Sequence, residues 1–402
     1  MDPVRNPFAP GAGTQPPELA GRDDLLSAAR ISLARIKLGR PAKSMMLIGL
    51  RGVGKTVLLD RIRAEAEAEG MVTVRVEASE GRSLPALLVP QLRVALLGLS
   101  RQAKSRDLAV RALRALAGFA RSLKVKYGDI EVGIDFEPEP GLADNGDLEQ
   151  DLLALLEAAG AAAGRADAAL VIFIDELQYV PEPQLAALIT ALHRCAQESL
   201  PVAVVGAGLP QLPGQMGRAK SYAERLFEFP VIGPLGRDAA SAAIRVPVAN
   251  EEEAIAVDAV DAIVTVTQGY AYFLQEWGKF AWDVAEGSPI TAADVELATR
   301  EAIASLDESF FRVRFDRLTP AERRYLRAMA ELGPGPHRSG DIAAILDRPV
   351  TSLAPLRAQL IGKGMVWSPG HGDTAFSVPL FDEFMRRVMP DDSWRDGPPS
   401  TH

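Results

Sequence analysis

The sequence lacks several features that define whole classes of protein. It has a single cysteine, Cys195, so no disulfide can form within the chain, and a disulfide-framed secreted protein is excluded. No uninterrupted apolar run approaches the ~20 residues needed to span a bilayer, and no apolar stretch of a signal peptide follows the first charges. Positive charge is not in excess, because the net charge is −9 over 402 residues. We therefore expect a cytoplasmic protein with no membrane partner that is not a bulk nucleic-acid packager.

Hydrophobic residues make up 48% and charged residues 24%, which is ordinary for a globular chain of two to three domains. Strand-like apolar runs alternate with helical patterns over the first half. Strands are predicted at 45–49, 72–78, 169–175 and 201–208; helices are predicted at 22–39, 54–69, 84–99, 105–123, 147–163 and 182–199. This alternation predicts an α/β fold with a parallel sheet sandwiched by helices. From about residue 236 the strand signal fades and the patterns become helical.

A phosphate-binding loop is predicted at the end of the first strand, where GLRGVGKT (49–56) matches G-x-x-x-x-G-K-[ST]. Its glycines permit a tight turn whose N–H groups converge on phosphate oxygens at a helix N-terminus. Lys55 is then expected to reach the outer phosphates of ATP, and the Thr56 hydroxyl to ligate Mg²⁺. The residues assigned to nucleotide binding are Gly49, Leu50, Arg51, Gly52, Val53, Gly54, Lys55, Thr56 and Val57.

Two acids, Asp175 and Glu176, follow the most apolar strand. A Mg·ATP site needs a carboxylate for the metal, and Asp175 is assigned to it. Glu176 is placed to orient and deprotonate a water that attacks the γ-phosphate, and a role in binding alone is the other possibility. The alternative for the pair is an ordinary turn with acids near a helix start.

These residues carry a resemblance to a known family. GLRGVGKT with LVIFIDELQ (170–178) resembles the Walker A and Walker B pair of AAA+/STAND P-loop ATPases, and DELQ resembles their archaeal-type and Orc1/Cdc6-like branch. PPELAGRDDLL (16–26) resembles the N-terminal box near the adenine in that branch. SYAERLFEFPVIGPL (221–235) resembles the stretch that carries an arginine finger. The resemblance implies that Leu19, Gly21 and Arg22 lie near the adenine of the nucleotide. It also implies that Arg225 is the arginine finger.

Two stretches depart from the family pattern. TQGYAYFLQEWG (267–278) resembles the helical-lid stretch, but it has Tyr270, Ala271 and Tyr272 where many AAA+ proteins have a Pro followed by a sensor arginine. No sensor-2 arginine is therefore expected. GAGLPQL (206–212) lacks the usual sensor-1 Asn or Thr, and Gln211 either substitutes for it or faces solvent.

Arg225 has two interpretations. It is a finger that stabilises charge on the transferring phosphoryl group, in cis or from a neighbouring subunit of a homo-oligomer. The alternative is a surface arginine paired with Glu224 or Glu228.

The segment 101–126 carries a local charge of +7 in this acidic chain. It indicates either a solvated helix face or a contact with the phosphate backbone of double-stranded DNA or with an acidic partner. Its basic residues are Arg101, Lys104, Arg106, Arg111, Arg114, Arg121, Lys124 and Lys126, against Asp107 alone.

The last region combines predicted helices at 320–332, 339–346 and 350–363 with two strands around a Gly-rich tip. That pattern is typical of a winged helix, whose recognition helix would turn Arg357, Gln359 and Lys363 toward DNA. A winged helix that contacts protein is the alternative, because the net charge of 319–389 is only +2.

Together these patterns predict a Mg²⁺-dependent ATPase that acts as a nucleotide-controlled switch coupled to DNA binding or to a DNA-associated assembly. The alternatives are a regulatory P-loop ATPase with protein contacts and an idle nucleotide-binding scaffold. The expected parts are an N-terminal arm (1–20), an AAA+ domain (21–235) with a basic helix and hairpin insert (about 100–146), a lid (236–310), a winged helix (311–390) and a tail (391–402).

Overall fold

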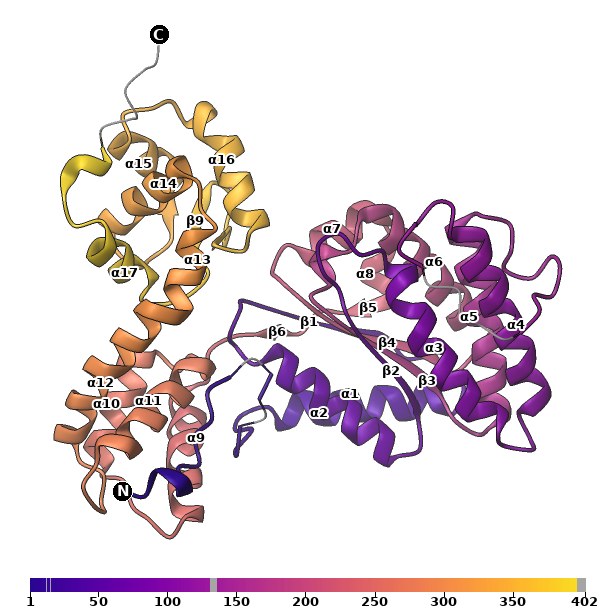
Figure 1. The fold of residues 1–402 in the computed structure, drawn as a ribbon, viewed down its shortest axis with the longest axis horizontal. Coiled ribbons are helices and arrows are strands. Elements are labelled where there is room, and N and C mark those ends of the chain that lie inside the picture. The colour runs from indigo at the N-terminus through magenta and orange to yellow at the C-terminus, as the bar shows by residue number, and fades with distance from the viewer. Residues whose placement is uncertain (12, 15, 131–135, 396–402) are drawn as a thin grey trace. The chain divides into compact units, whose positions relative to one another are not determined.

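The computed structural model describes residues 1–11, 13–14, 16–130 and 136–395, which form two compact units (Figure 1). The α/β unit comprises 22–49 and 55–232. The helical unit comprises 1–21, the loop 50–54 and the chain from 233 onward. Among the helices of the described residues, none combines the length and apolar character needed to cross a bilayer.

A parallel sheet forms the centre of the α/β unit. Its order is β2-β3-β4-β1-β5, with β6 also paired to β1. The strands are β1 (Ser44–Gly49), β2 (Val72–Glu77), β3 (Leu170–Asp175), β4 (Val202–Gly208), β5 (Phe227–Glu228) and β6 (Val231–Ile232). Every residue of β3 and β4 is buried, as expected for strands covered on both faces. β5 and β6 lie in the apolar segment that follows Arg225, where the sequence is strand-like, and each contains only two residues.

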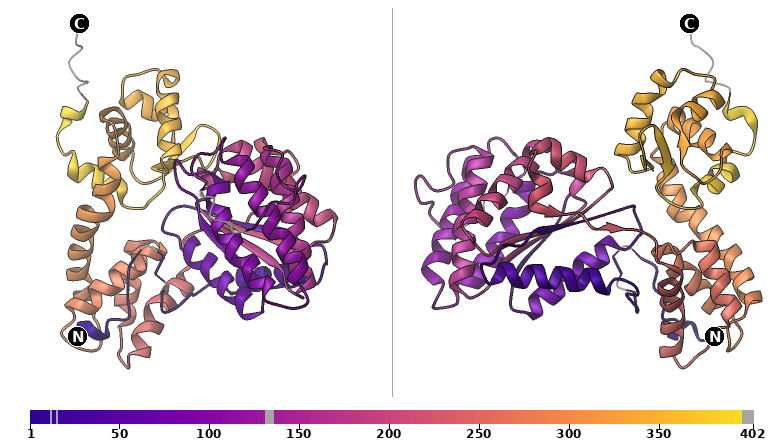
Figure 2. Two further views of the ribbon diagram at one scale, coloured as in Figure 1. Left: turned by 45° about the vertical axis from the view of Figure 1, so that its right-hand side comes forward. Right: turned by 180° about the vertical axis from the view of Figure 1, so that it is seen from behind.

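Helices cover both faces of this sheet, which confirms the predicted α/β class (Figures 1 and 2). On one face lie α1 (Asp23–Lys37) and α2 (Lys55–Ala68), and on the other α3 (Leu84–Ser100), α5 (Leu148–Arg165) and α6 (Glu182–Gln197). Cys195 is buried on α6. The basic helix α4 (Arg106–Leu123) packs its Ala- and Leu-rich side on α3 and α5. Two short helices, α7 (Leu212–Ala219) and α8 (Ala223–Leu226), lead to β5.

The hairpin predicted near residues 124–137 lies partly outside the described residues, because 131–135 are not among them. Before that gap, α4 ends at Leu123 and the chain continues in turns, with Tyr127 and Lys126 both donating their N–H to Leu123 O. Residues 124–130 therefore contain no strand.

The helical unit begins with the N-terminal residues, which lie on one of its own helices. Phe8 is buried so close to Gly278 that a Cβ there would lie 2.6 Å from its ring. Trp282 donates its indole N–H to Asp2 O at 2.8 Å. The helices of this part are α9 (Arg237–Asn250), α10 (Val257–Thr267), α11 (Ala271–Val284) and α12 (Ala292–Leu306).

A π-helical turn (Asp307–Phe311) and α13 (Arg312–Asp316) lead from α12 into the C-terminal module. The helices of this module are α14 (Pro320–Glu331), α15 (Ser339–Ile345), α16 (Val350–Gly362) and α17 (Phe381–Val388). Its antiparallel sheet has the order β7-β9-β8, from β7 (His337–Arg338), β8 (Val366–Trp367) and β9 (Asp373–Phe376). α17 was not predicted as a helix.

Candidate nucleotide site

The loop 50–54 connects the end of β1 to the start of α2, as the motif predicts. Gly52 and Gly54 have φ values of 82° and 94°, in the left-handed region that glycine enters without strain. Lys55 opens α2 and is buried, and the first turn of that helix contains no acid. The arrangement is a helix N-terminus preceded by a glycine turn, which suits an anion.

The acids lie at the carboxyl edge of the same sheet, because β3 is parallel to β4 and β4 to β1. Asp175, the last residue of β3, is 2% exposed. Its Oδ2 accepts a bond from Arg75 Nη2 at 3.2 Å, and Arg75 also pairs with Asp60. The hydroxyl of Thr56 and the carboxylate of Asp175 are hard oxygen donors that fit a Mg²⁺ ion carrying phosphate and water ligands. Arg75 partly neutralises Asp175, a contact that sequence reasoning missed.

Glu176 has a left-handed backbone, with φ 53°, and its N–H donates to Asp175 Oδ1 at 2.9 Å. Gln178 Nε2 donates to Glu176 Oε2, and Gln178 Oε1 accepts from Leu209 N at 3.2 Å. Gln178 thus fixes the Glu176 carboxylate relative to the end of β4. Gln211, expected either to substitute for sensor 1 or to face solvent, is half-buried at the N-cap position of α7 and makes no side-chain capping hydrogen bond.

The loop packs within the helical unit against the start of α11. The Tyr270 ring is so close to Gly52 that a Cβ there would lie 2.8 Å from its Oη. Tyr272 N donates to Gly52 O at 3.1 Å, and Arg51 Nη1 donates to Lys363 O at 3.2 Å. Tyr270 and Tyr272, which the sequence offered only as departures from a family pattern, are therefore contact residues of the phosphate loop.

Residues of the predicted N-terminal box lie at the start of α1. Gly21 has φ 69°, and a Cβ there would approach Ala239 Cβ to 2.7 Å, so only glycine fits without movement. Burial lowers the pKa of Arg22, whereas Leu19 is half-buried. An adenine contact by these residues stays a prediction.

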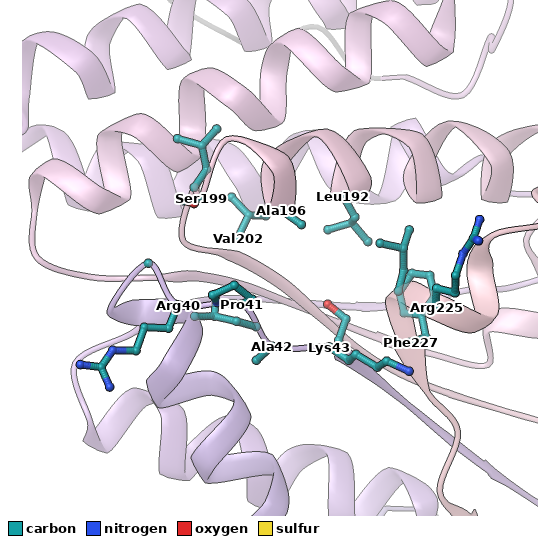
Figure 3. Close-up of a pocket in the computed structure, with 15 residues that line it drawn as sticks. Arg40, Pro41, Ala42, Lys43, Leu192, Ala196, Ser199, Val202, Arg225 and Phe227 are labelled. Carbon is teal, nitrogen blue, oxygen red and sulfur yellow. The ribbon is translucent and has the colours of Figure 1, made fainter.

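Arg225 lies at the opposite, amino edge of the sheet. β5 starts two residues later and runs parallel to β1, with Phe227 opposite Ser44. The length of β1, roughly 15–20 Å, separates this edge from the phosphate loop. Arg225 lines a pocket of about 330 Å³ there with Arg40 and Lys43 (Figure 3). It forms no ion pair within the described ranges, so the predicted alternative partners Glu224 and Glu228 do not hold it.

Of the residues predicted to contact DNA, Arg357 and Lys363 form hydrogen bonds within the C-terminal module, whereas Gln359 lies at its surface. Arg357 donates to Thr374 Oγ1 at 2.6 Å, Ser368 Oγ at 2.8 Å and Asp373 O at 2.6 Å, so it joins α16 to β9. Lys363 Nζ donates to Glu322 Oε2 at 2.7 Å and to Arg317 O at 3.1 Å. Gln359 is exposed. Two of the three predicted DNA contacts therefore have intramolecular partners.

The basic segment is partly neutralised as well. Lys104 pairs with Asp167 at 3.0 Å, Arg111 with Glu139 at 3.2 Å and Arg121 with Glu137 at 3.5 Å. The acids that follow α4 thus reduce the charge of its exposed face.

The chain matches the structure of the Walker-type ATPase PABY2304 of Pyrococcus abyssi with a TM-score of 0.59 and 16% identity, over 93% of this chain and 97% of that one. The fold of this chain is that of the P-loop NTPases. Residues 18–205 match the family model described as AAA ATPase domain, and residues 308–385 match a domain of unknown function, DUF8462.

Two further structures align over most of their length at a TM-score of 0.45. The Thermotoga maritima RuvB Holliday junction branch migration motor is 15% identical, over 95% of this chain and 99% of that one. The Aeropyrum pernix Orc1 protein in complex with DNA is 17% identical, over 95% and 96%. No curated protein matches this chain in sequence.

Proposed function

We propose that the protein binds and slowly hydrolyses Mg·ATP and uses the nucleotide state as a switch. The observation that carries the proposal is the glycine loop before Lys55, at the same sheet edge as the buried Asp175. Lys55 would contact the outer phosphates, while Thr56 and Asp175 would hold the metal. The metal would neutralise charge developing on the phosphates.

Glu176 would act as the general base for hydrolysis. Its carboxylate, oriented by Gln178, would accept a proton from the attacking water. Arg225 lies at the edge of the sheet opposite the loop of its own chain, so we propose that it acts in trans, in an oligomer, on a neighbouring site.

The C-terminal module has three helices before an antiparallel hairpin, which supports a winged helix. We propose that it couples the nucleotide state to double-stranded DNA, with a further contact through segment 101–126. A specific observation favours a protein partner as the second candidate. Arg357 and Lys363 are bonded internally, and the exposed positions of α16 are uncharged: Val350, Thr351, Ser352, Ala354, Pro355, Ala358, Gln359 and Gly362.

The decisive experiment measures ATP hydrolysis with and without duplex DNA for the wild type, Lys55→Ala and Glu176→Gln. Stimulation by DNA that both variants abolish is the expected result. If DNA does not change the rate of hydrolysis and no salt-sensitive DNA binding is seen in any nucleotide state, the second candidate is favoured, a switch whose C-terminal module binds a protein. Tight ATP binding without turnover would reduce the function to a scaffold.

A further inference from the structure

The phosphate loop contacts a small cluster that the nucleotide-binding motifs do not include. Within the helical unit, Gly52 lies against the Tyr270 ring and accepts the N–H of Tyr272. Tyr272 in turn stacks on Phe310 with ring centroids 4.9 Å apart. Phe310 belongs to the π-helical turn, a type of irregularity often found at functional sites.

Arg314 lies one turn further along the chain and is anchored to this cluster. Its guanidinium centre lies 3.6 Å from the Phe310 ring centroid, and Nη1 donates to Phe310 O at 2.7 Å. Burial lowers the pKa of Arg314 to about 10; Tyr270 and Tyr272 oppose this shift, whereas the nearby Arg51 adds to it. Across the described stretches of chain, no carboxylate forms an ion pair with Arg314. The acid of this cluster, Glu276, instead accepts the Tyr272 hydroxyl at 2.7 Å.

Beside the loop, within the described part of the chain, the Arg314 cation therefore lacks an anion, and the Tyr270 hydroxyl lacks a hydrogen-bond partner. Arg314 is half-buried, so its cation loses part of its hydration without this compensation, and the second guanidinium of Arg51 nearby increases the cost. The Tyr270 hydroxyl is also buried, with 1% of the residue exposed, and it has no hydrogen-bond partner in the described structure. A single anion beside Gly52 would accept from the hydroxyl and compensate the cation.

We propose that Arg314, assisted by the Tyr270 hydroxyl, binds the phosphate groups of the nucleotide held by the loop. This inference rests on the proposed function, because it takes ATP as the ligand of that loop. It assigns to the segment after the lid a phosphate-binding arginine that the lid stretch lacks. It also gives residues 308–385 a direct contact with the nucleotide.

The test measures ATP and ADP affinity by calorimetry, and the rise in melting temperature on adding Mg·ATP. Arg314→Ala should weaken nucleotide binding by about tenfold or more while the ligand-free protein melts no lower than the wild type. Arg314→Lys should recover part of the affinity because it keeps the charge. The matched control is Arg312→Ala, because Arg312 lies two residues earlier and is exposed.

The outcomes separate this inference from the proposed function. If the wild type binds ATP, Lys55→Ala loses binding and Arg314→Ala binds like the wild type, the Arg314 inference is wrong and the proposed function stands. An Arg314→Ala protein that melts lower without ligand, yet has unchanged affinity, would show a purely structural role. Absence of nucleotide binding by the wild type would overturn both.

Discussion

The carboxyl edge of the sheet and the C-terminal module use their charged groups in different ways. At the sheet edge, Lys55, Asp175 and Glu176 come together at one end of parallel strands, although Asp175 also pairs with Arg75 and Glu176 with Gln178. In the module, Arg357, Lys363 and Arg327 donate to internal acceptors, among them Asp373 O, Glu322 and Met389 O. Counting charges along a sequence therefore overstates the basic surface of a small module whose cations satisfy its own backbone.

The largest expected effect tests whether a residue at the amino edge of the sheet, Arg225, takes part in ATP hydrolysis. Arg225→Ala should reduce turnover by ~10³-fold or more with unchanged nucleotide affinity, because an arginine finger acts on the transition state. In trans, a mixture of Arg225→Ala and Lys55→Ala proteins should recover part of the activity, since each supplies what the other lacks. Equal turnover in wild type and mutant would leave Arg225 as a surface residue.

The next effect concerns the general base at the carboxyl edge. Glu176→Gln should lower turnover by ~10²–10⁴-fold while ATP still binds. Gln178→Ala should cost less, about tenfold, because it removes the bond that orients Glu176 and leaves the carboxylate in place. Single-turnover kinetics measures the turnover of both variants. A Gln178→Ala enzyme as fast as the wild type would show that Glu176 needs no such support.

A third prediction compares the two glycines of the loop. Both have positive φ, so alanine at either should cost about 1–2 kcal/mol. At Gly52 a methyl group also overlaps Tyr270, whereas nothing lies within 4 Å at Gly54, so Gly52→Ala should be worse by a further ~1–3 kcal/mol. Urea unfolding measures the difference, and adding Tyr270→Ala should remove most of it. Equal losses at the two positions would mean that Tyr270 does not press on the loop.

The smallest effect concerns the module. Arg357→Ala should lower its unfolding free energy by about 1–3 kcal/mol, because three hydrogen bonds to Thr374, Ser368 and Asp373 are lost. Gln359→Ala, on the same helix and exposed, is the control. If DNA binds, Arg357→Ala should leave the salt dependence of binding unchanged. A loss of about one unit of salt slope with unchanged stability would instead place Arg357 at the DNA.

The sequence could predict the phosphate loop and the acid pair because both are local. Gly52, Gly54 and Lys55 are fixed by the strand before them and the helix after them, and Asp175 by the end of one apolar strand. The partners of Arg357 and Lys363 are Thr374 and Glu322, which lie 17 and 41 residues away, so their use depends on packing. The location of Arg314 depends on a π-helical turn and on stacked rings, which leave no periodic signal.

The buried Cys195 has a practical consequence for observing a conformational change. Burial, followed by the nearby Glu157, raises the pKa of its thiol to about 12, so it stays protonated at neutral pH and reacts slowly. The wild-type chain is therefore a background with little competing labelling. A cysteine introduced at Val313, which is 62% exposed and adjacent to Arg314, would accept a fluorophore. Because Cys195 would carry little label, a change in emission on adding nucleotide would come from the fluorophore beside Arg314.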